Sequence, residues 1–323
     1  MNKKLILTLL PMMLLCACKS NSSSRVPTVP TITWTDTGTS SDTNTNTNSD
    51  VITGSVSVEE PSYEGAREIT LEEAREIGRA MSEYQDSDEF SLPNELVSVV
   101  KTTGKTDVAI EGYSSLSMNE KCVFSASNYY YRTELSSSDT STKNWRYVGS
   151  SPITTETGDY YLDATSTLEE STYTKEKINS QTEKDAKLEE LKESYKEEQL
   201  DILTGKSFLG QLDVDDSDES TRIDCKYYTK GVGSLIVYGE IVVNNYEFSF
   251  GEASVNGSMK TAVSYVWDNY LIVSGSTDAL FKTKVLFSEV SGSMKTTQTI
   301  TTPKSGDFNK PNYSNFTEKE ITE

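Results

Sequence analysis

The 323-residue sequence contains no histidine, so the residues that could carry chemistry are carboxylates, lysines, tyrosines, serines and cysteines. Histidine is the usual general base near neutral pH, the activator of serine and cysteine nucleophiles, and the commonest transition-metal ligand. An enzyme built from this sequence would have to work with carboxylates, lysine, tyrosine or serine, for example as a carboxylate-based glycoside hydrolase. The adjacent acidic pairs Glu169-Glu170 and Glu189-Glu190 lie in turn-like or helix-like contexts that indicate solvated positions. We therefore expect no enzymatic activity and assign no catalytic residue.

An acidic stretch, Asp213-Val214-Asp215-Asp216-Ser217-Asp218-Glu219, is the best candidate for a metal site. A calcium-binding EF-hand loop requires oxygen ligands at its positions 1, 3 and 5, a glycine at position 6 and a bidentate glutamate at position 12. Counted from Asp213, the last two positions hold Asp218 and Asp224 instead. The stretch is therefore more typical of an acidic surface loop, and we expect no metal and no other cofactor.

The four cysteines fall into two groups, Cys16 and Cys18 near the start and Cys122 and Cys225 in the body of the chain. The second pair could form one disulfide in an exported protein, or both residues could be buried free thiols, and their spacing leaves both alternatives open. Two cysteines without a histidine cannot build a zinc site.

The first cysteine group closes a segment built like a secretory signal peptide. A positively charged start precedes an apolar run over residues 5–15, which is shorter than the roughly 20 residues that a membrane-spanning helix needs. The sequence Leu15-Cys16-Ala17-Cys18 resembles the lipobox of bacterial lipoproteins, with leucine at −3, a small residue at −1 and cysteine at +1. The resemblance implies that residues 1–17 are removed and that Cys18 is lipidated. The protein would then be exported and held to the cell membrane by acylated Cys18, with its folded domain on the extracytoplasmic side.

After Cys18, residues 19–50 are mostly Ser, Thr, Asn and Asp, a composition that cannot bury enough apolar surface to fold. We expect residues 18–50 to be a lipidated cysteine followed by a disordered tether. The chain has a formal net charge of −20, which becomes −22 when Lys3 and Lys4 leave with the signal peptide. Such an acidic body repels phosphate backbones, so we expect no nucleic-acid partner. The sequence indicates no particular protein partner.

Two helices are predicted from capping boxes followed by apolar residues at helical spacing. Thr70-Leu71-Glu72-Glu73 opens a helix over residues 71–84. Ser180-Gln181-Thr182-Glu183 opens a longer acidic helix over 182–203, and Gly205 is its predicted stop. Few residues of the longer helix could form a coiled-coil seam, so we favour a helix that lies across a sheet.

Alternating apolar and polar residues predict strands on both sides of the long helix. Short runs fill residues 96–163, and longer ones fill 222–290, including a hairpin whose predicted turn is Asp268-Asn269. Together these elements predict a single α+β domain over residues 51–295. It would be a large, curved, half-barrel-like antiparallel β-sheet packed with the N-terminal helix and the long acidic amphipathic helix. Residues 296–323 are expected to form an extended or disordered tail.

A lipid-anchored antiparallel sheet crossed by helices is similar to the lipoprotein carriers of the LolA and LppX type. The resemblance covers roughly residues 66–290. It implies a lipid or other apolar ligand held between sheet and helices, on the face that carries Tyr246, Phe248, Phe250, Tyr265 and Trp267. The alternative is a surface-exposed interaction or structural lipoprotein with a solid core and no ligand cavity.

Overall fold

A computed structural model describes residues 52, 54–107, 115–137, 140–150, 156–212, 221–250, 253–285, 288–304, 306–308 and 316–318. The predicted signal peptide over 1–17, the lipidation site Cys18, the tether over 19–50 and the acidic stretch 213–219 lie outside the described residues. The side chains of 211, 221, 245–250, 253–256 and 283–289 also lie outside the description, although their backbone is placed where these positions belong to a helix or strand.

Thirteen strands and three helices make up the described chain. Their bounds are β1 Arg67–Ile69, α3 Leu71–Gln85, β2 Leu96–Thr106, β3 Ser115–Phe124, β4 Tyr129–Ser137, β5 Ser141–Ser150, β6 Asp159–Ser166, β7 Ser171–Ile178, α4 Gln181–Thr204, α5 Lys206–Gln211, β8 Thr221–Thr229, β9 Leu235–Phe250, β10 Ala253–Asp268, β11 Leu271–Val285, β12 Ser288–Thr301 and β13 Thr317–Glu318.

Both predicted helices are confirmed, and their ends follow from local hydrogen bonds. The Thr70 hydroxyl accepts the Glu73 amide at 3.2 Å at the start of α3, and the Ser180 hydroxyl accepts the Glu183 amide at 3.1 Å at the start of α4. Gly205 ends α4 in the left-handed conformation at φ +66°, which glycine adopts without a steric penalty. The short helix α5, which follows at once, has no counterpart in the sequence-based prediction.

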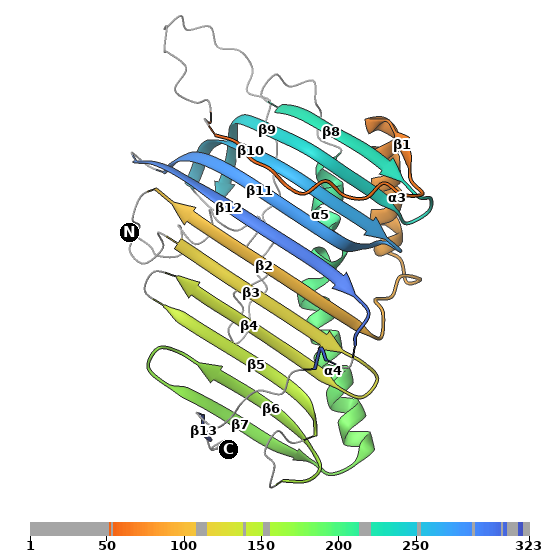
Figure 1. Cartoon of the computed structure of the whole chain (residues 1–323), viewed down its shortest axis with the longest axis vertical. Helices are drawn as coiled ribbons and strands as arrows, with labels where there is room; N and C mark the ends of the chain where they lie inside the picture. Colours follow the sequence, from red (N-terminus) through yellow and green to blue (C-terminus); the bar gives the residue numbers. More distant parts are fainter. Residues whose placement is uncertain are drawn as a thin grey trace, which may run out of the picture.

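All thirteen strands join one open sheet in the order β1-β8-β9-β10-β11-β12-β2-β3-β4-β5-β6-β7-β13 (Figure 1). Neighbouring strands pair antiparallel except β13, which runs parallel to β7. The sheet-dominated α+β class is therefore confirmed. The sheet consists of two meanders, β2–β7 and β8–β12. The last strand of the second meander, β12, pairs with the first strand of the first meander, β2.

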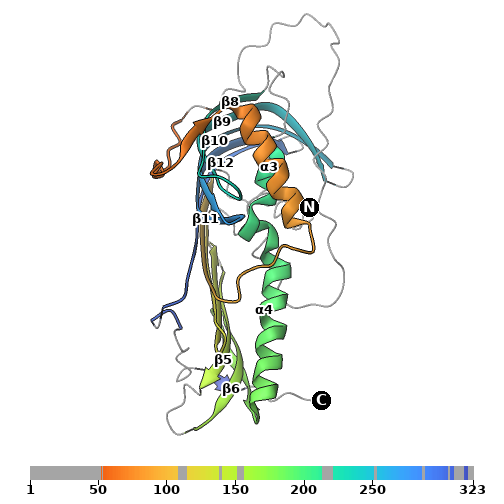
Figure 2. The same ribbon diagram turned by 90° about the vertical axis from the view of Figure 1, so that its right-hand side faces the viewer.

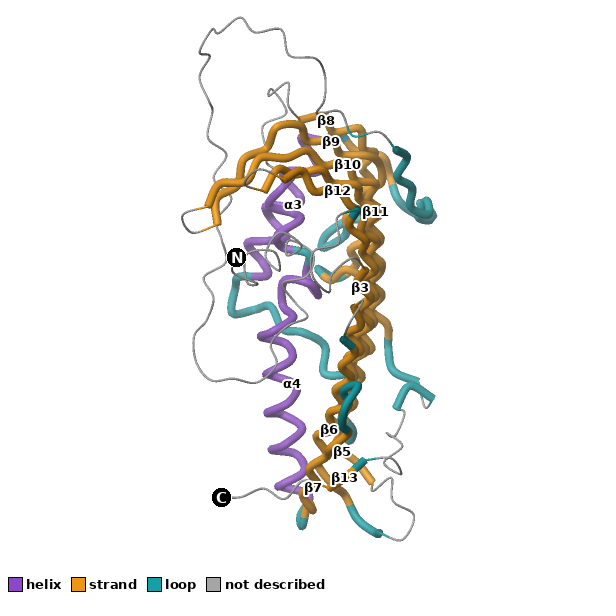
Figure 3. The backbone as a smooth tube through the Cα atoms, turned by 90° about the vertical axis from the view of Figure 1, so that its left-hand side faces the viewer, coloured by secondary structure: helices purple, strands orange, loops and turns teal. Residues whose placement is uncertain are grey.

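The helices lie on one face of this sheet, which we call the inner face (Figures 2 and 3). Helix α4 begins beside β7 and runs back along the lower strands toward the second meander, where α5 and α3 continue the layer. Figure 2 shows that strands β8–β10 bend over α3, whereas the lower strands are nearly flat. The helices thus cover both parts of the inner face.

The hairpin between β10 and β11 differs by one residue from the prediction. Asp268 pairs with Leu271, so the two-residue turn is Asn269-Tyr270 rather than Asp268-Asn269. Both turn residues have positive φ, +48° and +66°, as a type I′ turn requires. Tyr270 is tolerated there because its ring packs against Tyr84 of α3 with ring centroids 4.1 Å apart.

Three groups of buried apolar residues stabilise the domain. The upper inner core lies between α3, α5 and the second meander, and the lower inner core lies between α4 and the first meander. The outer core lies on the opposite face of β3–β6 and includes Val123, Tyr130 and Leu162, with Phe308 and Phe316 packed against it. The expected tail over 296–323 therefore begins inside β12, and its described residues after β12 include part of the outer core.

Cys122 and Cys225 are both free thiols. Cys122 lies on β3 and Cys225 on β8, which are six strand positions apart in the sheet. At about 4.8 Å per strand, the separation is far beyond the reach of a disulfide. Of the two alternatives that the sequence left open, the structure supports free thiols.

Candidate functional site

The predicted apolar ligand face was assigned to five aromatic residues, and the structure describes the side chains of two. Trp267 is fully buried and its indole Nε1 donates to the Thr204 carbonyl at 2.8 Å, at the last turn of α4. The Tyr265 hydroxyl bonds Thr277 Oγ1 at 2.8 Å. Phe208 of α5 lies over both rings, with centroids 4.6 Å from Tyr265 and 5.6 Å from Trp267.

The other three residues of that face, Tyr246, Phe248 and Phe250, belong to β9. Their backbones pair with Gly257, Val255 and Ala253 of β10, and their side chains lie outside the described part of the structure.

Two hollows open at the surface of the described domain. One, of about 500 Å³, lies at the β6–β7 turn beside β13, and the other, of about 290 Å³, lies between residues 56–58 and strands β8–β10. Both are open to solvent, and neither is lined by Tyr265, Trp267 or any helix. Trp267 of the predicted ligand face is therefore packed on all sides by protein, whereas Tyr265 is partly buried against the same core.

A buried polar layer lies elsewhere, between α4 and the first meander. Glu120 of β3 points into it, because it shares the parity of Cys122 and Phe124, which are buried under the helix. Only 3% of Glu120 is exposed. Its carboxylate accepts a hydrogen bond from the Tyr131 hydroxyl of β4 at 3.2 Å and another from the Tyr195 hydroxyl of α4 at 3.4 Å.

Burial raises the pKa of Glu120 to about 7, because a carboxylate loses its hydration there. The two tyrosine hydrogen bonds act in the opposite direction, and the charge of Glu198 on α4 adds to the rise. Burial also raises the pKa of the Cys122 thiol and of the Tyr195 phenol well above their ordinary values. Glu120 is thus a group in this layer that changes charge near neutral pH.

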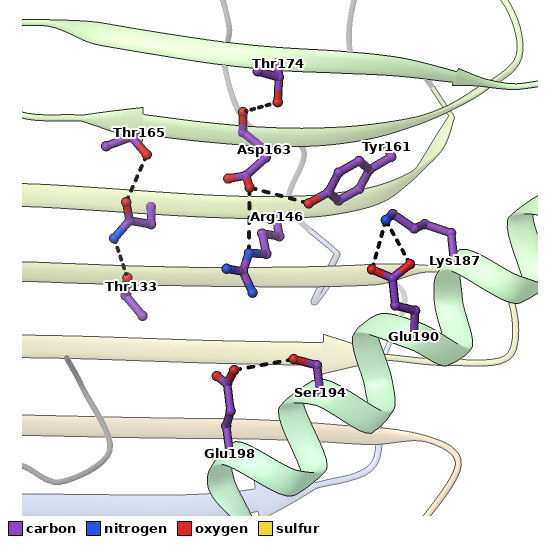
Figure 4. A network of polar contacts seen from close by, with 11 residues as sticks. Thr133, Arg146, Tyr161, Asp163, Thr165, Thr174, Lys187, Glu190, Ser194 and Glu198 are labelled. Atoms are coloured by element: carbon purple, nitrogen blue, oxygen red, sulfur yellow. Dashed lines mark hydrogen bonds and ion pairs between the residues drawn. The ribbon is translucent and has the colours of Figure 1, made fainter. Parts of the chain in front are cut away.

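The layer continues along α4 as a network of polar contacts (Figure 4). Arg146 Nε of β5 lies 3.9 Å from an Asp163 oxygen of β6, and the Tyr161 hydroxyl donates to the same carboxylate at 3.4 Å. Burial raises the pKa of Asp163, against the effect of Arg146. Lys187 of α4 pairs with Glu190 and lies 4.5 Å above the Tyr161 ring, which is a cation–π contact.

A second set of side chains crosses the same strands beside this network. The Asn144 amide donates to Thr133 Oγ1 at 3.3 Å, and the Thr165 hydroxyl donates to Asn144 Oδ1 at 3.1 Å. These bonds tie β4, β5 and β6 together on the inner face. The Glu120 carboxyl group can therefore bind or release a proton. No activated nucleophile lies beside it among the described residues.

Other residues considered from the sequence have surface roles. Glu169-Glu170 lie in the exposed β6–β7 turn, and Glu189-Glu190 lie on the exposed side of α4. Among the described residues, no group of three or more acidic or cysteine side chains is arranged to hold a metal ion. Within the same part of the chain, no helix is both long enough and apolar enough to cross a membrane.

Glu120 was not singled out by the sequence-based reasoning. The signal that could have found it is its place in Met118-Asn119-Glu120-Lys121-Cys122, where it alternates in phase with Met118 and Cys122. An acidic residue at an apolar position of a strand is a candidate buried charge.

The chain was compared with known proteins in three ways. No family model, no curated protein and no solved structure matches it.

Proposed function

We propose that this protein is an exported lipoprotein, attached to the membrane through acylated Cys18, whose domain works as a solid interaction or structural module. The lipobox-like Leu15-Cys16-Ala17-Cys18 supports the anchor. The observation that carries the second half of the proposal is the complete burial of Trp267 beneath Phe208 and α4. A side chain that is packed on all sides leaves no room for an acyl chain at that position.

A substitution at Cys18 tests the anchor. Cys18→Ser removes the thiol that would take the lipid, so the protein is expected to leave the membrane fraction after cell fractionation. Cys16→Ser is the matched control and should stay with the membrane, because large Leu15 precedes Cys16 where the lipobox has a small residue. A Cys18→Ser protein that partitions into the membrane like the unaltered chain would contradict the anchor.

Crosslinking on intact cells tests the interaction module. A lysine-directed crosslinker should join the anchored protein to a repeatable partner through residues of its outer surface. Denatured samples should not yield the same product. If only self-crosslinked or random products form at several crosslinker concentrations, the interaction role is wrong.

The second candidate is a carrier that holds a lipid or other apolar ligand between the sheet and the helices, in a half-barrel-like fold. The bend of β8–β10 around α3 in Figure 2 favours this candidate. Native mass spectrometry of the purified protein should then show co-purified lipid. If the measured mass is that of the protein without lipid, and if the protein also binds no apolar dye, the carrier role is wrong and the solid interaction module is supported.

A further inference from the structure

Helix α4 and the sheet share one buried carboxyl group, that of Glu120. The helix contributes the Tyr195 hydroxyl and the sheet contributes the Tyr131 hydroxyl, at 3.4 Å and 3.2 Å from the two carboxylate oxygens. Neither partner carries a positive charge, and no ion pair joins Glu120 to any described lysine or arginine. Hydrogen bonds from neutral hydroxyls replace only part of the hydration that a buried carboxylate loses.

The charged and titratable groups that face Glu120 do not supply a counter-charge either. On its own strand the titratable group of the same face is the Cys122 thiol, and on β4 it is Tyr131, whereas Lys121 on the other face of β3 pairs with Asp307. Helix α4 adds Tyr195 and the carboxylate of Glu198, whose negative charge opposes ionisation of Glu120. On β2 the residue opposite Glu120 is Val100.

Arg146 is a cation of the polar layer, and its ion pair is with another carboxylate. It lies beside Tyr131 and pairs with Asp163 of β6. Lys187 and Lys192 of α4 lie over the rings of Tyr161 and Phe124. The positive charges near this part of α4 are therefore committed to partners other than Glu120.

The two ends of α4 are held differently. Its C-terminal end is tied by buried hydrogen bonds, from Trp267 Nε1 to the Thr204 carbonyl at 2.8 Å and from Gln298 Nε2 to the Ile202 carbonyl at 2.7 Å. Its first turns are tied to the sheet by the ion pair of Lys184 with Asp159 at 3.0 Å and by the Lys187–Tyr161 contact. The buried hydrogen bonds to the α4 backbone therefore lie at its C-terminal end, whereas side-chain ion-pair and cation–π contacts hold its first turns.

We propose that Glu120 is a pH-responsive latch: its neutral form holds α4 on the inner face, and its ionisation lets the N-terminal part of the helix lift. The lifted helix hydrates the carboxylate and uncovers Tyr131, Arg146 and Asp163. Lifting is a rare event, because Leu188, Leu191 and Tyr195 must leave the lower inner core. Ionisation of Glu120 increases the fraction of molecules in which the helix is lifted.

The size of the effect follows from linkage between proton binding and opening. The pKa of Glu120 is about 7 under the closed helix, against an ordinary value of 4.5 for a hydrated carboxyl. The opening equilibrium can therefore increase by about 10²-fold when the pH rises from 5 to 8.5. Lowering the pH closes the latch.

Cys122 offers a built-in probe of this motion. Its thiol is fully buried under α4, two residues from Glu120 on the same face of β3. A thiol reagent can reach it when the helix lifts or when the whole domain unfolds. Cys225 is partly exposed on β8, far along the sheet, and serves as an internal control.

The experiment measures the rate at which N-ethylmaleimide labels Cys122 and Cys225 in the full chain, by peptide mass spectrometry, from pH 5 to pH 8.5. The unaltered protein is compared with Glu120→Gln at each pH, so that the pH dependence of thiol chemistry cancels. For Cys122 we expect the rate in the unaltered protein to exceed that in Glu120→Gln by only about 4-fold at pH 5 and by more than about 10²-fold at pH 8.5. The ratio of the two rates for Cys225 should stay near one.

Two outcomes would overturn the latch. One is a Cys122 ratio that does not change with pH. The other is an equal rise at Cys122 and Cys225, which would mean that ionisation unfolds the whole domain rather than releasing α4.

A second variant covers the case in which Glu120→Gln does not fold. Tyr195→Phe removes one donor to the carboxylate, so it should accelerate Cys122 labelling at pH 8.5 more than at pH 5. An equal acceleration at both pH values would mean a loss of packing alone and would also overturn the proposal.

Discussion

The buried carboxyl group of Glu120 contributes to the pH dependence of the domain's stability. Its environment combines burial, two neutral hydroxyl donors and a nearby acidic residue on α4. In the unfolded chain the same group is hydrated and has its ordinary pKa. The folded protein therefore binds a proton that the unfolded protein releases between pH 4.5 and 7.

This difference predicts that the stabilising contribution of Glu120 is fully present below pH 4.5 and is lost as the pH rises through 7. With a folded pKa of about 7, the loss at pH 8 amounts to at most about 3 kcal/mol of the free energy of unfolding. The free energy of unfolding of Glu120→Gln should be close to that of the unaltered protein at pH 4.5. At pH 8 it should be higher by up to that amount. Urea denaturation at the two pH values measures this.

Glu189→Gln on the exposed side of α4 is the matched control and should keep the pH dependence of the unaltered chain. If Glu120→Gln loses as much stability at pH 8 as at pH 4.5, the carboxyl is stabilising in its charged form and the assignment is wrong.

At the scale of elements, the junction of α4, α5 and the β10–β11 hairpin holds the upper inner core together. The Thr204 carbonyl accepts from Trp267 Nε1 at 2.8 Å and from Gln85 Nε2 of α3 at 3.3 Å. Gln85 also donates to the Tyr270 carbonyl at 2.8 Å, in the hairpin turn. Three elements distant in the sequence therefore meet at the last turn of α4.

Gly205 makes this junction possible, and its substitution gives a second prediction. A Cβ at this position would lie 2.9 Å from Trp267 Cζ2 and closer still to Ile272, in a left-handed backbone conformation that alanine disfavours. Gly205→Ala should lower the free energy of unfolding by about 2–4 kcal/mol, from backbone strain and overpacking together.

Gly210→Ala in α5 is the control for that substitution. A Cβ there meets no atom within 4 Å, so thermal or urea unfolding should change by less than about 1 kcal/mol, and in the stabilising direction. If both variants lose a similar amount of free energy of unfolding, the tight packing around Gly205 is not the cause of the loss.

At the scale of the molecule, the lower part of the sheet is buried on both faces. Helix α4 covers the inner face, and Phe308 and Phe316 of the C-terminal segment pack on the outer core. Figure 2 shows the chain after β12 leaving on the side opposite the helices. Phe316 lies 5.4 Å from the Trp145 ring and 6.4 Å from the Tyr173 ring, both in edge-to-face geometry.

This two-sided burial predicts that Phe316→Ala weakens the domain although the residue packs on the face opposite the helices. The loss should be about 1–3 kcal/mol, below that of a fully buried phenylalanine because Phe316 is only partly buried. The fluorescence of Trp145 should shift to the red as water reaches its ring. Leu168→Ala in the exposed β6–β7 turn is the control and should change neither signal.

The sequence alone determined the features that depend on neighbours in the chain. Capping hydrogen bonds form within three residues, so the starts of α3 at Thr70 and α4 at Ser180 could be predicted, as could the stop at Gly205. Side-chain alternation of period two likewise predicted the α+β class and the strands within residues 96–163 and 222–290, whereas β1, β7, β13 and most of β12 were not predicted. The anchor at Cys18 also comes from a local motif and stays a prediction.

Only the tertiary structure decided which faces meet. The pairing of β12 with β2 joins residues nearly two hundred positions apart, and no local pattern specifies it. The packing of α4 on the first meander covers Glu120 and turns a strand glutamate into a buried carboxyl with a raised pKa. Burial and charge cost depend on what lies opposite in space, whereas periodicity and caps depend only on what lies next in sequence.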